Sequence, residues 1–224
     1  MTKEVFEQDR YCGLKEASLP LPGMRPEDIA KFVLQGLPGG GPLVSSQGVS
    51  RLLITLDGPC ASGKTTLARK LAQVFHGEVI HTDDYVIPHA QKTPERLAVP
   101  GGNCDAERLV REVVAPFKQG NAVSYRRYDC MKDILLPEEQ LPDTGVLILE
   151  GSYCNLPAIR EYADVRLFLD APWEIREARL LARESAASMR RFLERWIPLE
   201  NAYFEAYHLP DEGNILISAK TAFP

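Results

Sequence analysis

The chain has 224 residues, of which 45% are hydrophobic and 25% are charged, and these proportions are ordinary for a globular protein. This length is enough for a single α/β domain with a sizeable core. A formal net charge of −5 argues against a basic surface that binds nucleic acid. The sequence has no apolar stretch that could span a membrane and no secretory signal, and its five scattered cysteines are typical of reduced thiols, so we expect a cytoplasmic protein.

Residues 1–50 are expected to form an extension ahead of a main domain at residues 51–224. Pro26 in a first turn and Gly36 after a last turn predict a short helix from Arg25 to Gln35. The prolines and glycines of residues 37–42 then predict a flexible link. Nothing in the sequence indicates what the extension does.

A glycine-rich turn follows the apolar run at residues 52–56. Residues 58–65 read G-P-C-A-S-G-K-T, which matches the phosphate-binding pattern G-x-x-x-x-G-K-T, and apolar residues at helical spacing come next. A strand, a turn and a helix in this order direct backbone N–H groups and a helix N-terminus at a phosphate. The alternative is a glycine-rich turn before an ordinary helix, which the strand–turn–helix context disfavours. We therefore predict a site for a nucleoside triphosphate.

Each residue type in this loop has a physical role in binding ATP and Mg²⁺. Gly58 and Gly63 let the backbone approach phosphate oxygens. Lys64 would reach the β- and γ-phosphates, and the hydroxyl of Thr65 would bind Mg²⁺. The predicted ATP-binding residues are Gly58, Ala61, Ser62, Gly63, Lys64, Thr65 and Thr66.

Strand and helix patterns alternate along the rest of the chain. A helix is predicted at residues 105–118, with a kink at Pro116, and further helices extend to about Tyr207. Alternation of this kind is typical of an α/β fold, here the three-layer P-loop NTPase fold, with a parallel central sheet and helices on both faces. Ligands of such sheets bind beyond the carboxyl ends of the strands. The strands are predicted at residues 52–56, 78–81, 146–149, 165–169 and 214–218.

Acidic residues follow two of these strands. Glu150 ends the strand at 146–149, where P-loop enzymes place an acidic residue that holds the Mg²⁺ shell. Asp83 and Asp84 are adjacent, which is unfavourable unless a cation, a helix N-terminus or a hydroxyl shares the site. We predict that Asp83 orients a substrate hydroxyl and takes its proton late in phosphoryl transfer. The alternative is that one of the two caps a helix and the other is solvated.

Arginines recur on one face of a predicted helix, at Arg176, Arg179 and Arg183. A kinase must neutralise the charge on the transferring phosphoryl group and exclude water, and a small helical lid with arginines does both. Arg179 and Arg183 are therefore predicted to be catalytic, together with Asp83 and Lys64. Glutamates in the same segment leave open a solvated face with salt bridges. A later aromatic stripe is more typical of a core than of a ligand site, and it comprises Phe192, Trp196, Tyr203 and Tyr207.

The order of these motifs resembles the uridine kinase/phosphoribulokinase family of P-loop kinases over about residues 51–218. The glycine-rich loop at 58–66, the segment 81–85 and the segment 149–151 are similar to the family's motifs. The resemblance implies that Asp83 is the catalytic base, that Glu150 faces the metal with Thr65, and that Arg179 and Arg183 belong to the lid. It also implies acceptor-binding roles for Asp83, Tyr85, Asp105, Tyr125, Arg127 and Tyr128.

Three features depart from the family's pattern. Val86 stands where many uridine kinases carry an aromatic residue that stacks on the base, the spacing after Asp105 differs, and residues 179–184 lack part of the family's arginine cluster. Asp105 also fits the N-cap of the helix that follows it. Tyr125 and Tyr128 also fit an ordinary edge strand. The phosphoryl-donor half of the resemblance is therefore better supported than the uridine-specific half.

The sequence as a whole predicts a kinase that uses ATP and Mg²⁺ to phosphorylate a hydroxyl of a nucleoside or a sugar-like small molecule. One alternative is an NTP hydrolase or switch, but the guanine motif N-K-x-D and the signature L-S-G-G-Q are both absent. Another is a nucleotide-binding module without catalysis, which the joint presence of Lys64, Thr65, Asp83 and Glu150 disfavours. The expected partner is the small-molecule acceptor, with no nucleic acid and no membrane, and a homo-oligomer is left open.

Overall fold

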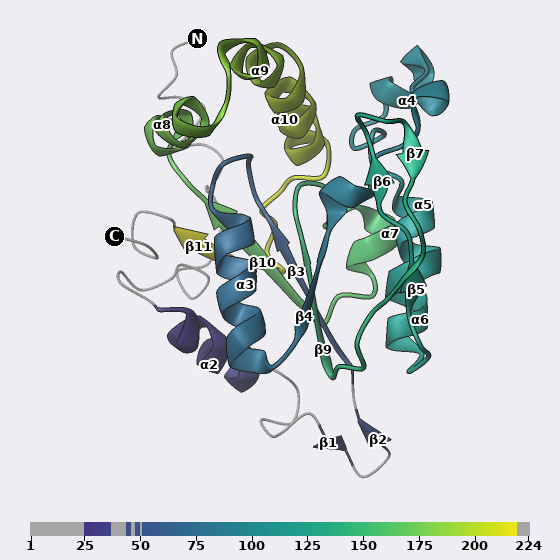
Figure 1. The fold of residues 1–224 in the computed structure, drawn as a ribbon. Coiled ribbons are helices and arrows are strands. Elements are labelled where there is room, and N and C mark those ends of the chain that lie inside the picture. The colour runs from purple at the N-terminus through teal and green to yellow at the C-terminus, as the bar shows by residue number, and fades with distance from the viewer. Residues whose placement is uncertain (1–24, 37–43, 46–47, 50, 219–224) are drawn as a thin grey trace.

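A five-stranded parallel sheet forms the centre of the computed structural model, which describes residues 25–36, 44–45, 48–49 and 51–218. The strand order is β11-β10-β3-β9-β4 (Figure 1). All five predicted strands are confirmed to within one residue at each end. Their bounds are Leu52–Asp57 for β3, Glu78–His81 for β4, Val146–Glu150 for β9, Val165–Asp170 for β10 and Asn214–Ser218 for β11.

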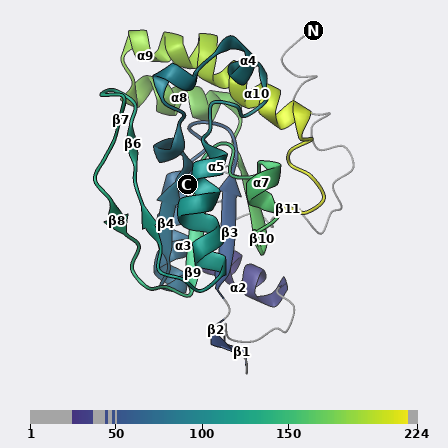
Figure 2. The same cartoon turned by 90° about the vertical axis from the view of Figure 1, so that its right-hand side faces the viewer.

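Helices cover both faces of this sheet. On one face lie α2 (Pro26–Gly36) and α3 (Lys64–Phe75), and on the other lie α5 (Ala106–Leu109), α6 (Ala115–Lys118) and α7 (Pro157–Arg160). Figure 2 shows α5 in front of the sheet and α3 behind it. The predicted three-layer α/β fold is therefore confirmed.

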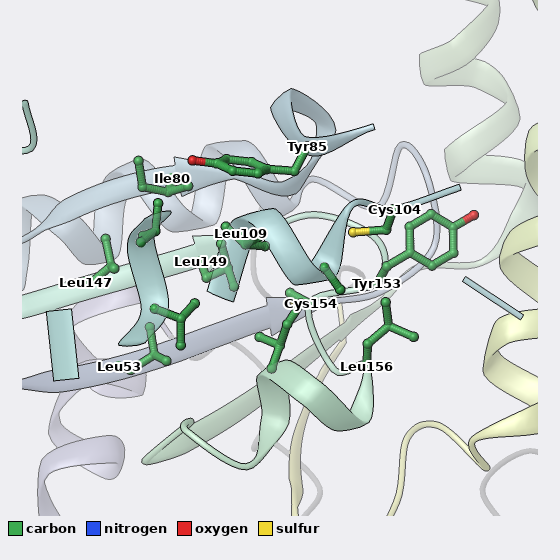
Figure 3. Packing of buried hydrophobic residues seen from close by; sticks show 14 of the residues in the cluster. Leu53, Ile80, Tyr85, Cys104, Leu109, Leu147, Leu149, Tyr153, Cys154 and Leu156 are labelled. Atoms are coloured by element: carbon green, nitrogen blue, oxygen red, sulfur yellow. The ribbon is translucent and has the colours of Figure 1, made fainter. Parts of the chain in front are cut away.

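The alternation of side chains along each strand supplies both cores. Along β9, Val146 and Ile148 join the core under α2 and α3, whereas Leu147 and Leu149 join the core under α5 and α7. Figure 3 shows Leu147 and Leu149 packed with Leu53 and Leu109. Each fully buried leucine stabilises the fold by about 1.5–3 kcal/mol. A strand buried on both faces is typical of the middle of a parallel sheet.

The helix predicted at residues 105–118 contains a π-helical segment, η5 (Val110–Val114), between α5 and α6. Pro116 has no N–H, and its ring would clash with the carbonyl four residues earlier in a regular helix. The wider π turn immediately before the proline accommodates both effects. The predicted distortion at Pro116 is therefore present, as a π bulge. The same combination recurs where η6 (Phe192–Trp196) precedes Pro198 in α10 (Ile197–Ala206).

The N-terminal extension includes the predicted helix, which the structure confirms as α2. Its residues Ile29, Ala30 and Val33 are buried in the same core as Leu67 and Leu71 of α3. The extension thus contributes to the main core, and the domain division at residue 50 stays a prediction. The predicted flexible link at 37–42 lies outside the described residues, and β1 (Val44–Ser45) pairs with β2 (Gly48–Val49).

Short elements surround the carboxyl end of the sheet. The helices α8 (Trp173–Arg183), α9 (Ala186–Arg191), η6 and α10 lie at the top of Figure 1, beyond the strand ends. The helical lid is part of the confirmed fold. No helix in the described ranges combines the length and hydropathy needed to cross a membrane. The other short elements are η3 (Thr82–Tyr85), η4 (His89–Gln91), α4 (Pro94–Ala98), and the pairs β5 (Ser124–Tyr125) with β8 (Glu139–Gln140) and β6 (Tyr128–Asp129) with β7 (Ile134–Leu135).

Candidate active site

The glycine-rich loop between β3 and α3 passes very close to the neighbouring strand. At Gly58 φ is 140°, and a Cβ atom there would lie 2.2 Å from the carbonyl oxygen of Leu169 in β10. Gly63 also has a positive φ of 106°, directly before α3 begins at Lys64. A positive φ favours glycine at both positions, and at Gly58 any side chain would also clash with the carbonyl group of Leu169. The loop therefore needs both glycines to place its backbone at the N-terminus of α3, as the phosphate-binding motif requires.

Lys64, the first residue of α3, is buried beside this loop. Its Nζ donates hydrogen bonds to the carbonyl oxygens of Gly58, at 2.7 Å, and Pro59, at 3.0 Å. The charge of the ammonium group contributes to the lowered pKa of Glu150, and it opposes the rise that burial causes in the pKa of Asp83. Lys64 thus lies where a positive charge is needed between the loop and the predicted catalytic acids.

The predicted metal ligands lie side by side. Thr65 Oγ1 donates a hydrogen bond of 2.9 Å to Glu150 Oε1, and His81 Nδ1 lies 2.5 Å from the same oxygen. Burial raises the pKa of Glu150, but the hydrogen bond from His81 and the charge of Lys64 outweigh burial and lower it overall. A hydroxyl and an ionised carboxylate are the hard oxygen donors that Mg²⁺ prefers. The residues present therefore fit the predicted Mg²⁺ site.

Asp83 extends from η3, which directly follows β4. Its side chain is reached by solvent through a cavity, although protein surrounds it on most sides. Burial raises the pKa of this carboxyl group, Lys64 opposes the shift, and the negative charge of Glu150 adds to it. Neither Asp83 nor Asp84 caps a helix, because the N-cap of η3 is His81. Asp83 faces the cavity, whereas Asp84 does not line it.

One cavity of about 1320 Å³ contains these groups. Ligand pockets are typically about 300–1,000 Å³, so this cavity is large enough for a nucleotide and a second small molecule. Its lining includes the glycine-rich loop, Lys64 and the lid arginines Arg179 and Arg183. The same cavity is also lined by Asp83, Val86, Asn103, Ser152, Tyr153, Phe192, Trp196 and Glu200.

Two lid arginines contact the glycine-rich loop. Arg179 Nη1 donates to the carbonyl oxygens of Ala61, at 3.0 Å, and Ser62, at 2.6 Å. The buried Arg176 donates from Nε to the carbonyl oxygen of Cys60 at 2.8 Å. Arg183 is half exposed, pairs with Glu184 at 3.1 Å and also lines the cavity. This face of α8 is thus directed at the nucleotide-binding loop, and only Arg183 resembles the solvated alternative.

Five of the six predicted acceptor-binding side chains do not line this cavity. The Tyr85 ring is fully buried in the core (Figure 3), and Asp105 is the N-cap of α5, accepting from the backbone N of Arg108 at 3.1 Å. Arg127 pairs with Glu139 at 2.7 Å, and Tyr125 bonds to the same carboxylate at 3.4 Å. Tyr128 bonds to Asp133 and, with Asp105, lines a separate cavity of about 280 Å³. Of the predicted set, only Asp83 reaches the main cavity.

Two other polar residues that line the cavity, Asn103 and Glu200, are not among the predicted acceptor-binding residues. Asn103 is 7% exposed, and its Oδ1 has no hydrogen-bond partner among the described residues. Glu200 is buried, accepts from the backbone N of Cys60 at 3.0 Å and from the hydroxyl of Ser152. Glu200 is one of two acids in α10, and nothing in the sequence distinguishes it from Glu205.

The aromatic stripe divides between the two environments. Phe192 and Trp196 line the cavity, and Phe192 also packs against the small core of Cys60, Leu180 and Met189. Tyr203 is fully buried and Tyr207 packs against the main core, as expected. Tyr203 also donates to Asp57 Oδ2 at 2.7 Å, and Asp57 Oδ1 accepts from the backbone N of Gly58 at 2.7 Å. Burial raises the pKa of Asp57 to about 6. A buried carboxylate that the sequence analysis missed thus supports the start of the glycine-rich loop.

Comparison with known proteins agrees with this geometry. The family model "Phosphoribulokinase / Uridine kinase family" matches residues 53–191. "Uridine kinase-like protein 3" of Arabidopsis thaliana is 26% identical over 83% of this chain, and a uridine kinase of Ligilactobacillus salivarius is 27% identical over 59% of it. The chain spans 40% and 66% of the lengths of these two relatives.

Two solved structures show the same fold. A Bacillus stearothermophilus protein described as a possible uridine kinase has a TM-score of 0.63 and 21% identity, with 86% of this chain and 96% of that chain covered. A Silicibacter sp. TM1040 protein, provisionally named a fructose transport system kinase, has a TM-score of 0.61 and 26% identity, with 90% and 100% covered. The match to the family model covers more than half of the chain and confirms the resemblance seen in the motifs. This chain belongs to the phosphoribulokinase/uridine kinase family of P-loop kinases.

Proposed function

We propose that this protein is a phosphotransferase that uses ATP and Mg²⁺ to phosphorylate a hydroxyl group of a nucleoside or a sugar-like small molecule. The observation that carries the proposal is that the glycine-rich loop and Asp83 open into the same cavity. A hydrolase needs room only for the nucleotide and a water molecule. The volume of about 1320 Å³ and the polar and aromatic side chains in its lining favour a second substrate.

The residues at the nucleotide end have distinct roles in this proposal. The loop backbone and the N-terminus of α3 bind phosphate oxygens, and Lys64 neutralises charge on the phosphoryl group that moves. Arg179 and Arg183 add positive charge from the lid and exclude water. Thr65 and Glu150 would hold Mg²⁺, which would supply positive charge that neutralises the charge developing on the phosphoryl oxygens.

Asp83 orients the acceptor hydroxyl and accepts its proton. A carboxylate with an ordinary pKa is a weak base toward an alcohol, but in a loose phosphoryl-transfer transition state the proton leaves late. Because burial and the charge of Glu150 raise the pKa of Asp83, its carboxylate is a better base than one in water. Its side chain accepts no hydrogen bond from the described residues, so it is free to bind a substrate hydroxyl.

The polar and aromatic residues in the cavity lining support a hydroxylated acceptor. Asn103, Ser152 and Glu200 offer oxygen atoms that accept hydrogen bonds from hydroxyl groups, and Phe192 and Trp196 offer apolar ring faces. Uridine kinases and a protein provisionally named for fructose transport are among the similar proteins, and both substrate classes carry several hydroxyls. Val86 provides no aromatic ring for base stacking, so sugars fit this lining as well as nucleosides do.

The test is a measurement of ADP release from ATP and Mg²⁺ with a panel of acceptors: pyrimidine and purine nucleosides, riboside vitamins, pantothenate, free sugars and sugar phosphates. Stimulation by one acceptor, with mass-spectrometric detection of its phosphate ester, supports the proposal. Rapid turnover that no acceptor changes would point to a hydrolase instead. Tight ATP binding with no turnover under any condition would point to a nucleotide-binding module.

A further inference from the structure

Three of the four residues of η3 are held in place, and the fourth is Asp83. The hydroxyl of Thr82 donates to the carbonyl oxygen of Ser152 at 2.8 Å. The ring of Tyr85 is fully buried, and its carbonyl oxygen accepts from the backbone N of Asp105 at 2.6 Å. The carbonyl oxygen of Asp84 accepts from Arg108 Nη2 at 3.2 Å. The position of Asp83 is therefore set by its neighbours and not by contacts of its own side chain.

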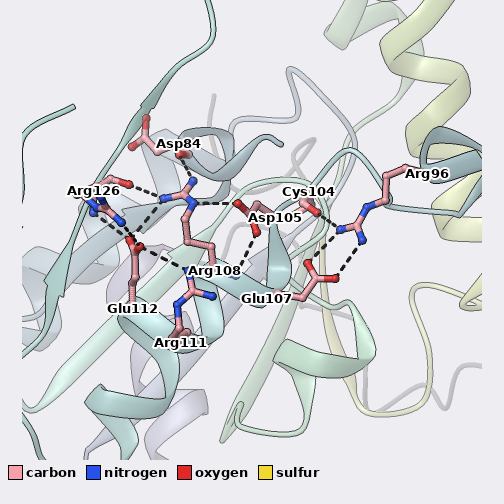
Figure 4. A network of polar contacts seen from close by, with 9 residues as sticks. All are labelled: Asp84, Arg96, Cys104, Asp105, Glu107, Arg108, Arg111, Glu112 and Arg126. Carbon is pink, nitrogen blue, oxygen red and sulfur yellow. Dashed lines mark hydrogen bonds and ion pairs between the residues drawn. The ribbon is translucent and has the colours of Figure 1, made fainter. Parts of the chain in front are cut away.

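Arg108 joins three segments that are distant in the sequence (Figure 4). Besides Asp84, its guanidinium donates from Nε to Asp105 Oδ2 at 2.9 Å and from Nη1 to the carbonyl oxygen of Arg126 at 2.5 Å. The side chain is only 6% exposed. One buried group thus ties the segment that carries Asp83 to the start of α5 and to the loop between β5 and β6.

The geometry of these contacts requires an arginine. The guanidinium carbon lies 4.2 Å from the centroid of the Tyr85 ring, so the planar group stacks on η3 while its edges bond to the three segments. Guanidinium presents five donors in a fixed plane, whereas lysine presents a single charged point with three donors. Lysine would keep the positive charge beside Asp105 and Glu112 but could not make this set of contacts.

We propose that Arg108 is a positioning residue for phosphoryl transfer, which fixes Asp83 in the cavity through Asp84 and Tyr85. The inference depends on the proposed role of Asp83 as the base. Arg108 itself does not line the main cavity, so it does not touch the reacting groups. Transfer is sensitive to such placement, because a displacement of about 1 Å at a reacting group can cost about a hundredfold in rate.

Arg96 offers a matched control on the same part of the chain (Figure 4). Its guanidinium also bonds to two carbonyl oxygens, of Gly102 at 2.8 Å and Cys104 at 3.1 Å, and to the carboxylate of Glu107. It makes no contact with η3 among the described residues. Arg96→Lys therefore loosens the segment before α5 without releasing Asp84.

The experiment compares Arg108→Lys with Arg96→Lys in the full chain. For Arg108→Lys we expect kcat with the best acceptor to fall about tenfold to a hundredfold, while the dissociation constant for ATP changes less than about twofold. Amide hydrogen exchange in a peptide spanning residues 82–87 should become faster. Arg96→Lys should leave kcat and the exchange of the η3 amides, residues 82–85, close to wild type. Any effect on catalysis should appear in the acceptor KM, because Arg96 holds the residues on either side of Asn103.

Several results would overturn the proposal: a kcat for Arg108→Lys within about threefold of wild type, an equal loss in Arg96→Lys, or a parallel loss of ATP binding. Unchanged exchange at residues 82–87 would overturn it without reference to activity. If the wild type phosphorylates no acceptor, the proposed function fails, whereas the exchange result still judges the contact between Arg108 and η3. Should Arg108→Lys not fold, Arg108→Gln, whose amide can still donate to one carbonyl, is measured in the same way.

Discussion

Asp83→Asn is the substitution that separates catalysis from nucleotide binding in this site. The change replaces one carboxylate oxygen by an NH2 group, so the side chain keeps nearly the same size and loses its negative charge. None of the described residues donates a hydrogen bond to Asp83, so no structural contact is broken. The asparagine can still contact an acceptor hydroxyl, but it cannot accept the proton. The expected effect is therefore on the chemical step.

The magnitude of this effect depends on the contribution of Asp83 as a base. Proton transfer to a positioned base contributes about 10²–10⁴ in rate, or about 3–5 kcal/mol of barrier. Lys64, Thr65 and Glu150 are unchanged by the substitution, so we expect kcat to fall by that factor while the ATP dissociation constant stays the same or decreases. A decrease is expected because the negative charge of Asp83 lies in the same cavity as the glycine-rich loop, where the anionic nucleotide would bind.

The assay is initial-rate ADP release at saturating acceptor, combined with ATP binding by calorimetry. Asp84→Asn is the matched control, since it removes the same charge from the next residue of η3, and the Asp84 side chain does not line the cavity. We expect Asp84→Asn to keep kcat within a few-fold of wild type, because substitutions of partly exposed residues outside a site usually have small effects. The reasoning is refuted if Asp83→Asn keeps more than about a tenth of the activity, or if both variants lose it equally.

Three further substitutions test other parts of the site. Lys64→Ala should weaken ATP binding by about tenfold to a hundredfold, which is the contribution of a charged hydrogen bond, and should also lower kcat. An unchanged ATP dissociation constant in calorimetry would contradict the role assigned to Lys64. Glu200→Gln should raise the acceptor KM about tenfold with little change in the ATP KM, in initial-rate measurements, and an effect confined to ATP would place Glu200 elsewhere. Because burial raises the pKa of Asp57 to about 6 in the folded state, its stabilising contribution is full below the unfolded pKa of about 4 and is lost as pH rises through about 6. Urea unfolding of wild type and Asp57→Asn should therefore show the wild type losing about 2–3 kcal/mol relative to the variant between about pH 4 and pH 7.5, and a constant difference would contradict the burial of this charge.

The donor half of the site could be predicted because its determinants are local. The motif at residues 58–65 fixes a strand–turn–helix unit by itself, and an apolar run fixes where β9 ends and hence where Glu150 lies. Neighbouring parallel strands end at the same edge of the sheet, so the prediction that Asp83 and Glu150 approach the loop needed only the fold class.

The cavity-lining residues outside the donor motifs could not be predicted as a set, because they are distant from one another in the sequence. Asn103 follows a loop and Glu200 lies on the last long helix, and no periodicity links them. Tyr85 was assigned an acceptor-binding role because it belongs to the segment 81–85, which resembles a family motif and also contains Asp83. In the tight turn of η3, however, the two side chains point in different directions, and that of Tyr85 enters the core. Proximity in sequence was thus a poor guide to direction.

The aromatic stripe was misjudged for a related reason. A period of 3.6 residues links Phe192, Trp196, Tyr203 and Tyr207 only if the helix is regular. The π segment η6 lies between residues 192 and 196 and precedes Pro198. A π turn carries additional residues, so it rotates the side chains of α10 relative to those of α9. The first two rings therefore face the cavity while Tyr203 faces the core.

The register of the central sheet also determines the chemistry of the metal site. In β9, Glu150 points to the same face of the sheet as Val146 and Ile148, which is the face that α3 covers. Thr65 lies in the first turn of α3, so the carboxylate contacts the threonine hydroxyl. The pairing of Glu150 with Leu56 in β3 and with His81 in β4 places all three strand ends at one level. A slip of β9 by one residue would turn Glu150 toward α5 and exchange the two cores at the same time. The apolar residues of β9 therefore hold Glu150 in place, since the contact between Thr65 and Glu150 forms only in the register that buries them.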